Sequence, residues 1–406
     1  MSKTVNVGTL FSGIGAFEEA MEQLGIAYKV AFACDNGEIE LTPLNKEERK
    51  EFKDFERRVR SLSDTEKARH KELKDKIAQI NESIREQCYS LPSKAERTAY
   101  VNDIYRQYEG DNTNWVKKSY IANNDIADED FHTDVRFMRG DDYLGKVDIL
   151  VGGSPCQSFS TYGKKQGLED ARGTLFYDYA RIIKESQPKI FIYENVASIL
   201  TNDRKRTWKT MLSVWESLGY EIVWSVLNAA DYNHPQLRKR LFLIGFRKDI
   251  YKTPYTFPEK QELTHKSTEY LESGPVDDKY YLGQKGFEWI TNPAKNLRRS
   301  RVNQDIIGCQ TANQQDNWIG DFRVEKPKPH HYNHERIYVG KYDFKDGKGL
   351  VDAVGRKMTP RECLNLMGFN PEFKIVVEDK IAYRQAGNSI VVPVLKEIIK
   401  SLESYL

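Results

Sequence analysis

The sequence predicts an α/β protein with a doubly wound sheet, a smaller domain inserted late in the chain and a helical insertion near its start. Two observations favour this class. Short apolar strands rich in β-branched residues alternate with amphipathic helical stretches, and a polar segment from about 253 to 355 interrupts this alternation without a helical period. The 406 residues, 39% hydrophobic and 30% charged, suffice for one or two cores of a globular protein.

Composition excludes some classes of protein and leaves others open. The 62 Lys and Arg residues nearly balance 60 Asp and Glu, so the net charge of +2 neither predicts nor excludes a nucleic-acid partner. Five cysteines without a CxxC pair indicate a reducing compartment and argue against disulfides or a thiolate zinc site. No apolar run is long enough to cross a membrane, and "MSKTVNV" lacks the apolar core of a secretory signal. We expect a cytoplasmic protein without a membrane partner.

The first strand, "TVNVGTL", runs through the glycine turn "LFSGIGAF" into a helix that Gly25 closes. Such a corner binds nucleotides, although an ordinary strand-to-helix turn would look alike. A dinucleotide site would carry a third glycine where this chain has Glu18. A carboxylate there suits the helix dipole but would repel a pyrophosphate, which favours a nucleoside without phosphates.

The second strand, "KVAFACD", ends on Asp35, where an acid can accept both hydroxyls of a ribose. A glycine corner with an acid at the tip of the next strand fits an NAD enzyme as well as a methyltransferase.

The stretch "VDILVGGSPCQSFS" favours the second interpretation. Residues 147–152 form an apolar strand, and we expect the two glycines that follow to turn the chain sharply, placing Pro155 and Cys156 at the ligand-binding edge of the sheet. A thiol there, followed by an amide and a loop of Ser, Thr, Gly and Lys, is typical of a nucleophile beneath a mobile lid. The alternative is a buried structural cysteine, for which a polar glycine turn is a poor setting.

Two later segments bring charged groups to the same edge. The strand in "QPKIFIYENVASIL" ends on Glu194 and Asn195, where desolvation would raise the pKa of the carboxyl group, and a protonated acid can polarise a heteroaromatic ring. In "YNHPQLRKRLFLIGF", Gln236, Arg238 and Arg240 alternate before a strand, so the two arginines point to one side. Guanidinium groups at this spacing suit a carbonyl oxygen and a phosphate.

Taken together, these motifs resemble those of the DNA cytosine-5 methyltransferases. The ordered matches are "FSGIG", "ACD", "TDV", "GGSPCQ", "RGTLF", "YENV", "QLRKR", "RKMTPRECLNLMGF" and "QAGNSIVVPV". They cover the first forty residues, roughly 130 to 250, and 355 to the end. The resemblance implies a Rossmann-like S-adenosylmethionine-dependent methyltransferase domain, residues 1–252 plus 356–406, with a target-recognition domain at 253–355.

The resemblance also implies a role for each matched residue. Cys156 would add to carbon 6 of a flipped cytosine, Glu194 would hold ring nitrogen 3, and Arg240 would hold the carbonyl oxygen, with Arg238 beside them. Phe11 would lie against the cofactor, S-adenosyl-L-methionine, and Asp35 would bind its ribose. The full set of cofactor contacts implied is Phe11, Gly13, Gly15, Asp35, Asp134, Val135, Pro155, Asn388 and Ser389.

A long insertion, about 40–115, separates the second strand from the rest of the pattern. Capping boxes at Ser63/Glu66 and Ser93/Glu96 predict helices within it. Its charges are of mixed sign, so we expect a small helical bundle, peripheral to the chemistry and removable, rather than a surface for a partner or DNA.

Double-stranded DNA is the partner that the resemblance implies. "GCQTANQQDNW" also offers Gln314 and Gln315 for base edges, "NLRRSR" offers Arg301, and "KPHHYNH" raises a metal site that we set aside because no cysteine or acid is near. The DNA contacts expected are Gln157, Ser158, Lys164, Lys165, Gln236, Arg298, Arg299, Gln310, Thr311 and Asn313.

Three other functions remain to be distinguished. A tRNA cytosine methyltransferase shares the catalytic set but typically has a shorter recognition segment. A catalytically silent DNA-binding relative is disfavoured because Cys156, Glu194 and Arg240 are all present, and an NAD oxidoreductase leaves "SPCQ" unexplained. We expect a metal-independent enzyme that acts as a monomer in bacterial or phage restriction-modification, or as an orphan methyltransferase.

Overall fold

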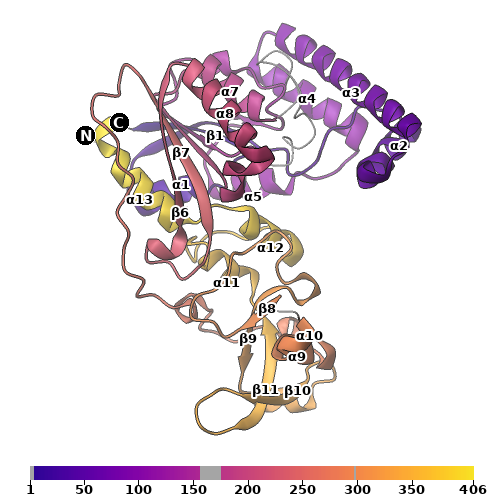
Figure 1. Ribbon diagram of the computed structural model, residues 1–406, viewed down its shortest axis with the longest axis vertical. Coiled ribbons are helices and arrows are strands. Elements are labelled where there is room, and N and C mark those ends of the chain that lie inside the picture. Colours follow the sequence, from indigo (N-terminus) through magenta and orange to yellow (C-terminus); the bar gives the residue numbers. More distant parts are fainter. Residues whose placement is uncertain (1–3, 156–174, 297–298) are drawn as a thin grey trace.

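The computed structural model describes residues 4–155, 175–296 and 299–406. Within them, a mixed sheet of seven strands forms the larger domain (Figure 1). Its first five neighbours run parallel, whereas β7 pairs antiparallel with both β5 and β6. The strands, in spatial order, are β3 (Phe131–His132), β2 (Tyr28–Cys34), β1 (Val5–Leu10), β4 (Ile149–Gly152), β5 (Ile190–Val196), β7 (Lys239–Arg247) and β6 (Tyr220–Asn228).

Helices cover both faces of this sheet, as a doubly wound fold requires. Side chains alternate along each strand, so Ile190 and Ile192 of β5 join one core while Phe191 and Tyr193 join the other. The first core contains α1 and α13 and the second contains α7 and α8. These helices are α1 (Ala16–Gln23), α7 (Leu175–Ser186), α8 (Arg206–Ser217), α11 (Pro360–Asn365), α12 (Asp379–Asn388) and α13 (Val392–Leu402).

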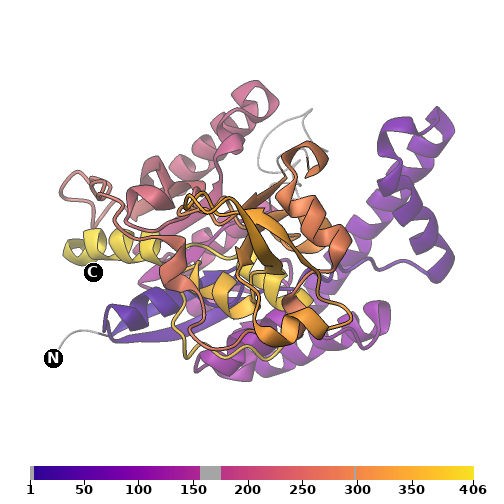
Figure 2. The same cartoon turned by 90° about the horizontal axis from the view of Figure 1, so that it is seen from below.

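The insertion is helical and extends from one side of the sheet domain in both views (Figures 1 and 2). Both predicted capping boxes are confirmed, at Ser63/Glu66 and Ser93/Glu96. The insertion packs on the sheet domain, since its Cys88, Val101 and Tyr105 are buried in one apolar cluster with Phe137. That the insertion is peripheral to the chemistry stays a prediction. Its helices, and the one that returns to the sheet, are α2 (Lys46–Arg57), α3 (Asp64–Ser90), α4 (Lys94–Glu109) and α5 (Trp115–Asn123).

The smaller domain lies beyond α11 and α12, at the opposite end of the molecule from the sheet (Figure 1). The expectation of no helix between 253 and 355 is wrong, since Phe287 and Ile290 of a short helix pack on the small sheet. Its elements are α9 (Gln284–Thr291), α10 (Pro293–Asn296), β8 (Ser300–Val302), β9 (Gly320–Glu325), β10 (Val339–Asp343) and β11 (Leu350–Lys357), with strand order β10-β11-β9-β8.

Among the described residues, no helix combines the length and the apolar character that crossing a membrane would require.

Candidate active site

Those predicted catalytic and cofactor residues that the structure describes gather along one edge of the large sheet. Strands β1 to β5 are parallel, so their carboxyl ends share this edge. Strand β7 is antiparallel to β5 and brings its first residues there, with Arg240 paired in register opposite Val196. The sheet topology, rather than sequence proximity, therefore places Arg240 beside Glu194.

The two glycines of "GGSPC" are required for a reason other than the one expected. Neither has a positive φ, so they do not supply a left-handed turn. Instead, a Cβ on Gly152 would lie 2.2 Å from the Leu10 carbonyl oxygen, and a Cβ on Gly153 would lie 2.2 Å from that of Glu194. The segment leading to the predicted nucleophile is thus packed directly against the ends of β1 and β5.

Hydrogen bonds from the end of β5 fix the same segment. The Asn195 side-chain amide donates to the Ser154 carbonyl oxygen (2.9 Å) and to the Tyr193 hydroxyl (2.8 Å), which itself bonds to the Ser154 hydroxyl (2.8 Å). Pro155, which ends the described stretch, is exposed. Cys156 follows it in the chain but lies outside the described residues, as do the expected DNA contacts Gln157, Ser158, Lys164, Lys165 and Arg298.

Glu194 and Arg240 form an ion pair at this edge, with 3.0 Å between the guanidinium Nε and the carboxylate Oε1. Their side chains are 15% and 18% exposed, so the pair is accessible to a ligand although mostly desolvated. Burial raises the pKa of Glu194 above its usual value, and the charge of Arg240 opposes that rise. The pair can therefore offer a proton and a guanidinium donor to one substrate ring.

Arg238 faces the same side as Arg240 but is buried and bonded within the protein. Its guanidinium donates to the carbonyl oxygens of Gln310 (2.6 Å), Ser389 (2.7 Å) and Gly387 (3.1 Å). Only 4% of the residue is exposed. The geometry differs from the expected catalytic role, because a guanidinium that donates to three backbone carbonyls has few donors left for a substrate. Arg238 instead ties residue 310 and the C-terminal segment to the start of β7.

Most amides expected to read base edges are also buried. Gln236 is fully buried, donates to the Leu366 carbonyl oxygen (2.8 Å) and accepts from the Gln310 backbone amide (3.2 Å). The Gln310 side chain donates in turn to the Cys363 carbonyl oxygen (3.1 Å). As the structure stands, Gln236 and Gln310 hold the loop in place and reach no base.

Gln314 and Gln315 of the same loop are buried as well. Their amides donate to the carbonyl oxygens of Tyr383 and Asp321, so the expectation that they read bases is not met either. The expected DNA contacts that lie exposed in the described chain are Arg299, Thr311 and Asn313.

The nucleoside corner has the expected backbone. Gly13 and Gly15 have φ of +55° and +88°, and Phe11 adopts φ of +53°, unusual for a bulky residue and a form of strain that clusters at ligand sites. The Asp35 carboxylate accepts from the backbone amides of Gly13 (2.9 Å) and Gly37 (2.8 Å), which locks the first and second strand ends together.

Glu18 does not act as the sequence suggested. It is 1% exposed and accepts a hydrogen bond from the Tyr120 hydroxyl (2.5 Å), and burial raises its pKa. Because it lies inside the protein, its charge does not face a ligand, so repulsion of a pyrophosphate is not supported as the reason for excluding a dinucleotide.

The remaining cofactor candidates lie at the same edge with their polar groups engaged. Asp134 is 5% exposed and its carboxylate accepts from Arg136 and from the Tyr105 hydroxyl of the insertion. Val135 is buried, and the exposed Asn388 donates to Glu38 (2.5 Å). Ser389 is buried, and its carbonyl oxygen is one of those that Arg238 binds.

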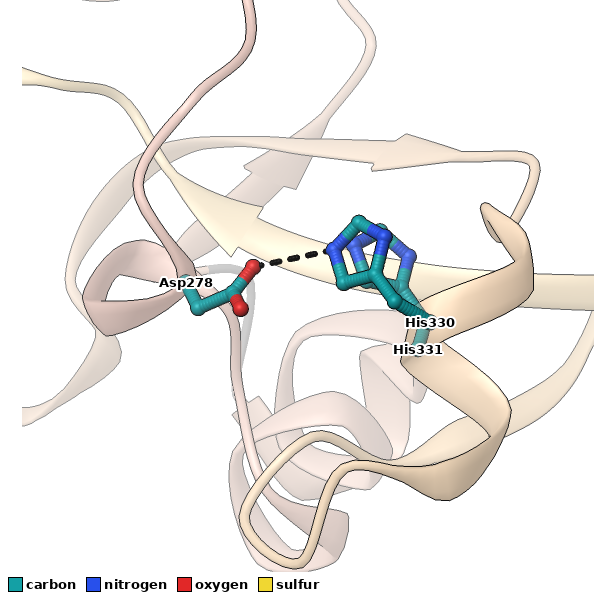
Figure 3. A group of neighbouring side chains, drawn as sticks. All are labelled: Asp278, His330 and His331. Atoms are coloured by element: carbon teal, nitrogen blue, oxygen red, sulfur yellow. Dashed lines mark hydrogen bonds and ion pairs between the residues drawn. The ribbon is translucent and has the colours of Figure 1, made fainter.

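Two neighbouring histidines of the small domain, His330 and His331, lie beside Asp278 (Figure 3). The premise that no acid is near them is wrong, because Asp278 lies 3.1 Å from His330 Nε2, and ligand atoms of both and of His331 lie within 4.8 Å of one another. His331 Nδ1, however, accepts from the Lys328 backbone amide (3.1 Å), which leaves its hydrogen on Nε2. That nitrogen cannot ligate a metal in this arrangement, and the ring packs against Tyr281 instead, with 4.4 Å between centroids.

Sequence reasoning missed two side chains at the site. The Cys309 thiol lies 3.4 Å from an Arg238 nitrogen and 3.8 Å from an Arg240 nitrogen, although it comes from the recognition segment. Tyr105 reaches the site from the insertion. No local motif marks either residue, since each contact depends on how distant segments pack.

Comparison with known proteins decides the family. A model of the family described as C-5 cytosine-specific DNA methylase matches residues 103–404. The chain belongs to this family. It is 35% identical over 295 residues to the type II methyltransferase M1.ScrFI of Lactococcus lactis subsp. cremoris, covering 70% of this chain and 68% of that protein. It is 32% identical over 259 residues to the type II methyltransferase M.HhaI of Haemophilus parahaemolyticus, covering 64% and 76%.

The predicted enzyme class, a DNA (cytosine-5)-methyltransferase, is confirmed by this membership. The solved structure of the S. pombe Dnmt2 methyltransferase covers 98% of both chains with a TM-score of 0.58 and 15% identity. At that identity the likeness shows the fold alone, and it confirms the predicted Rossmann-like methyltransferase class.

Proposed function

We propose that this methyltransferase transfers a methyl group from S-adenosylmethionine to carbon 5 of a cytosine flipped out of a specific duplex DNA sequence. The observation that carries the proposal is the Glu194–Arg240 pair, which lies against the segment leading to Cys156. The type II methyltransferases among the relatives support a bacterial or phage restriction-modification role, and we extend the proposal to action as a monomer in the cytoplasm.

In this reaction Cys156, as a thiolate, would add to cytosine carbon 6, which breaks the 5,6 double bond and makes carbon 5 nucleophilic. Glu194 would donate a proton or hydrogen bond to ring nitrogen 3, consistent with the raised pKa of its carboxyl group. Arg240 would bind the carbonyl oxygen, so both groups offset charge that develops on the ring. After carbon 5 has been methylated, loss of its proton restores the double bond and expels the Cys156 thiolate.

The cofactor site fits a nucleoside with a ribose. Asp35 accepts two backbone hydrogen bonds, and a carboxylate offers about four acceptor positions, which leaves capacity for ribose hydroxyls. Phe11, Gly13 and Gly15 would border the cofactor, with Asp134 at its adenine. When bound, S-adenosylmethionine supplies an electrophilic methyl group.

The test begins with bisulfite sequencing of DNA from cells that express the protein, which identifies the methylated sequence. A duplex of that sequence carrying 5-fluorocytosine should then form a denaturation-resistant adduct, because fluorine cannot leave as the proton does. Cys156→Ala should form none. An equal adduct from Cys156→Ala, no methylation of DNA, or methylation of tRNA in place of DNA would overturn the proposal.

A further inference from the structure

Helix α4 of the insertion packs directly on the segment that follows β3, where the predicted adenine contact lies. Tyr105 and Val101 of α4 share a buried apolar cluster with Phe137. At its edge, Thr98 donates to the Glu129 carbonyl oxygen (3.2 Å) and Arg97 pairs with Asp142 (2.5 Å). The helix is therefore anchored on both sides of residues 133–134.

Two further side chains of α4, three positions apart on one helix face, bond to those two residues. The Thr133 hydroxyl donates to Asn102 Oδ1 (2.7 Å), and the Tyr105 hydroxyl donates to Asp134 Oδ2 (2.7 Å). Tyr105 is 7% exposed and Asp134 is 5% exposed, so both bonds act in a largely desolvated place. Burial and the neighbouring carboxylate raise the pKa of Tyr105, so its hydroxyl remains a donor.

Arg136 and Tyr105 together hold the Asp134 carboxylate. Arg136 binds it through its backbone amide (2.9 Å to Oδ1) and its guanidinium (2.6 Å to Oδ2), all within the same loop. Tyr105 approaches from a different element and fixes Oδ2 against the insertion. Without it, Arg136 alone would hold the carboxylate, and Oδ2 would lose its contact with the insertion.

We propose that Tyr105 is a positioning residue for the cofactor, so that the insertion forms a wall of the cofactor site and sets its preference for adenine. The proposal rests on the proposed function, in which Asp134 faces the adenine 6-amino group. A carboxylate held in one orientation accepts from an amino group and repels a carbonyl oxygen at the same place. Tyr105 then governs discrimination at position 6 rather than the overall fold.

Titration calorimetry on the full chain tests this with two ligands, S-adenosylhomocysteine and S-inosylhomocysteine, which differ at position 6 of the purine. Tyr105→Phe should raise the dissociation constant for S-adenosylhomocysteine about tenfold or more, the loss typical of a hydrogen bond to a charged group. The dissociation constant for S-inosylhomocysteine should change much less. The KM for S-adenosylmethionine should rise while kcat at saturation and the KM for DNA stay within about twofold.

Tyr100→Phe is the matched control, because that hydroxyl bonds to Gln87 Oε1 (2.9 Å) on the exposed side of the insertion. Its two dissociation constants should equal those of the wild type. Asn102→Ala removes the neighbouring bond to Thr133 and should give a smaller loss with the same selectivity, which keeps the proposal testable if Tyr105→Phe folds poorly.

If Tyr105→Phe weakened the binding of both ligands equally, the effect would be a general loosening of the site and the proposal would be overturned. If it weakened the binding of neither, Tyr105 would have no role in cofactor binding and the proposal would be overturned as well. Failure of the wild type to bind S-adenosylhomocysteine would instead refute the proposed function on which the inference rests.

Discussion

Replacing Arg238 by Met should destabilise the protein without removing Glu194 and Arg240, the proposed catalytic pair. The guanidinium of Arg238 joins three backbone carbonyl oxygens from two segments that are distant in sequence, residue 310 and residues 387–389. Met has a similar length and apolar stem, so it retains much of the packing but leaves these carbonyls without their donor.

The magnitude follows from the number of unpaired groups. A buried acceptor left without a partner costs about 1–3 kcal/mol. We take the lower end for each of the three carbonyls, because burial lowers the pKa of Arg238 and the substitution also removes the cost of burying that charge. The expected loss is about 3 kcal/mol in the free energy of unfolding. For a chain of this length it corresponds to a fall in Tm of roughly 3–4 °C.

Arg240→Met provides the matched comparison on the same strand. Arg240 is bonded to the Glu194 carboxylate at the accessible edge, and it would act on the substrate. Its removal should change Tm little and lower the single-turnover rate about 10²–10³-fold, as expected when a donor to developing charge is lost. Arg238→Met, measured well below its Tm, should retain the rate within about tenfold.

Thermal unfolding and single-turnover methyl transfer from labelled cofactor, run on both variants, separate the two roles. If Arg238→Met kept the wild-type Tm and lost the rate as fully as Arg240→Met, the anchoring role would be refuted and Arg238 would belong to the catalytic set.

Three further predictions concern single sites. Gly153→Ala places a Cβ 2.2 Å from the Glu194 carbonyl oxygen, so strand β4 or β5 must shift and the single-turnover rate should fall at least about tenfold; a normal rate would show that the edge is less tightly packed. Burial raises the pKa of Glu18 above its usual 4.5, so the folded protein loses stability as pH rises from 4.5 through that raised pKa. Urea unfolding should therefore find that the stability of Glu18→Gln relative to wild type increases from pH 4 to pH 8; a constant difference across that range would contradict this. Asn313→Ala, at an exposed position, should alter the ratio of rates on cognate and single-base-variant duplexes, whereas Gln314→Ala, which breaks a buried bond, should lower Tm and leave that ratio unchanged.

The alternation of apolar strands and helices was enough to predict the sheet domain, because each strand's periodicity is a local property. The capping boxes at Ser63 and Ser93 were equally local and correctly marked where α3 and α4 begin. Helix α9 was not predicted, because its eight residues contain too few turns to show a helical period. The packing of α4 on the sheet domain was not predicted either, because the sequence of an amphipathic helix does not indicate which surface its apolar face packs against.

At the site, sequence could indicate which residue types meet at the sheet edge but not how they divide their hydrogen bonds. The sequence places Glu194 and Arg240 at strand ends on the same edge, and in the structure they form an ion pair. Gln236, Arg238 and Gln310 have the same chemistry as DNA-reading residues, yet burial directs their polar atoms to backbone carbonyls. A buried amide must be satisfied within the protein, and only the fold determines whether a given amide is buried.

The buried polar contacts also join the predicted recognition segment to the proposed catalytic residues within one short stretch. Gln236, Arg238 and Arg240 stand at alternate positions leading into β7, and the first two bind the loop at 309–310 while the third pairs with Glu194. The same loop lies against the C-terminal segment, where a Cβ on Gly387 would lie 2.1 Å from the Thr311 carbonyl oxygen. The loop therefore contacts both the start of β7 and the C-terminal segment. Residues 309–311 therefore lie close to Arg240 although they belong to the predicted recognition segment, and we expect exposed residues such as Arg299 and Asn313 to vary with the DNA sequence that is recognised.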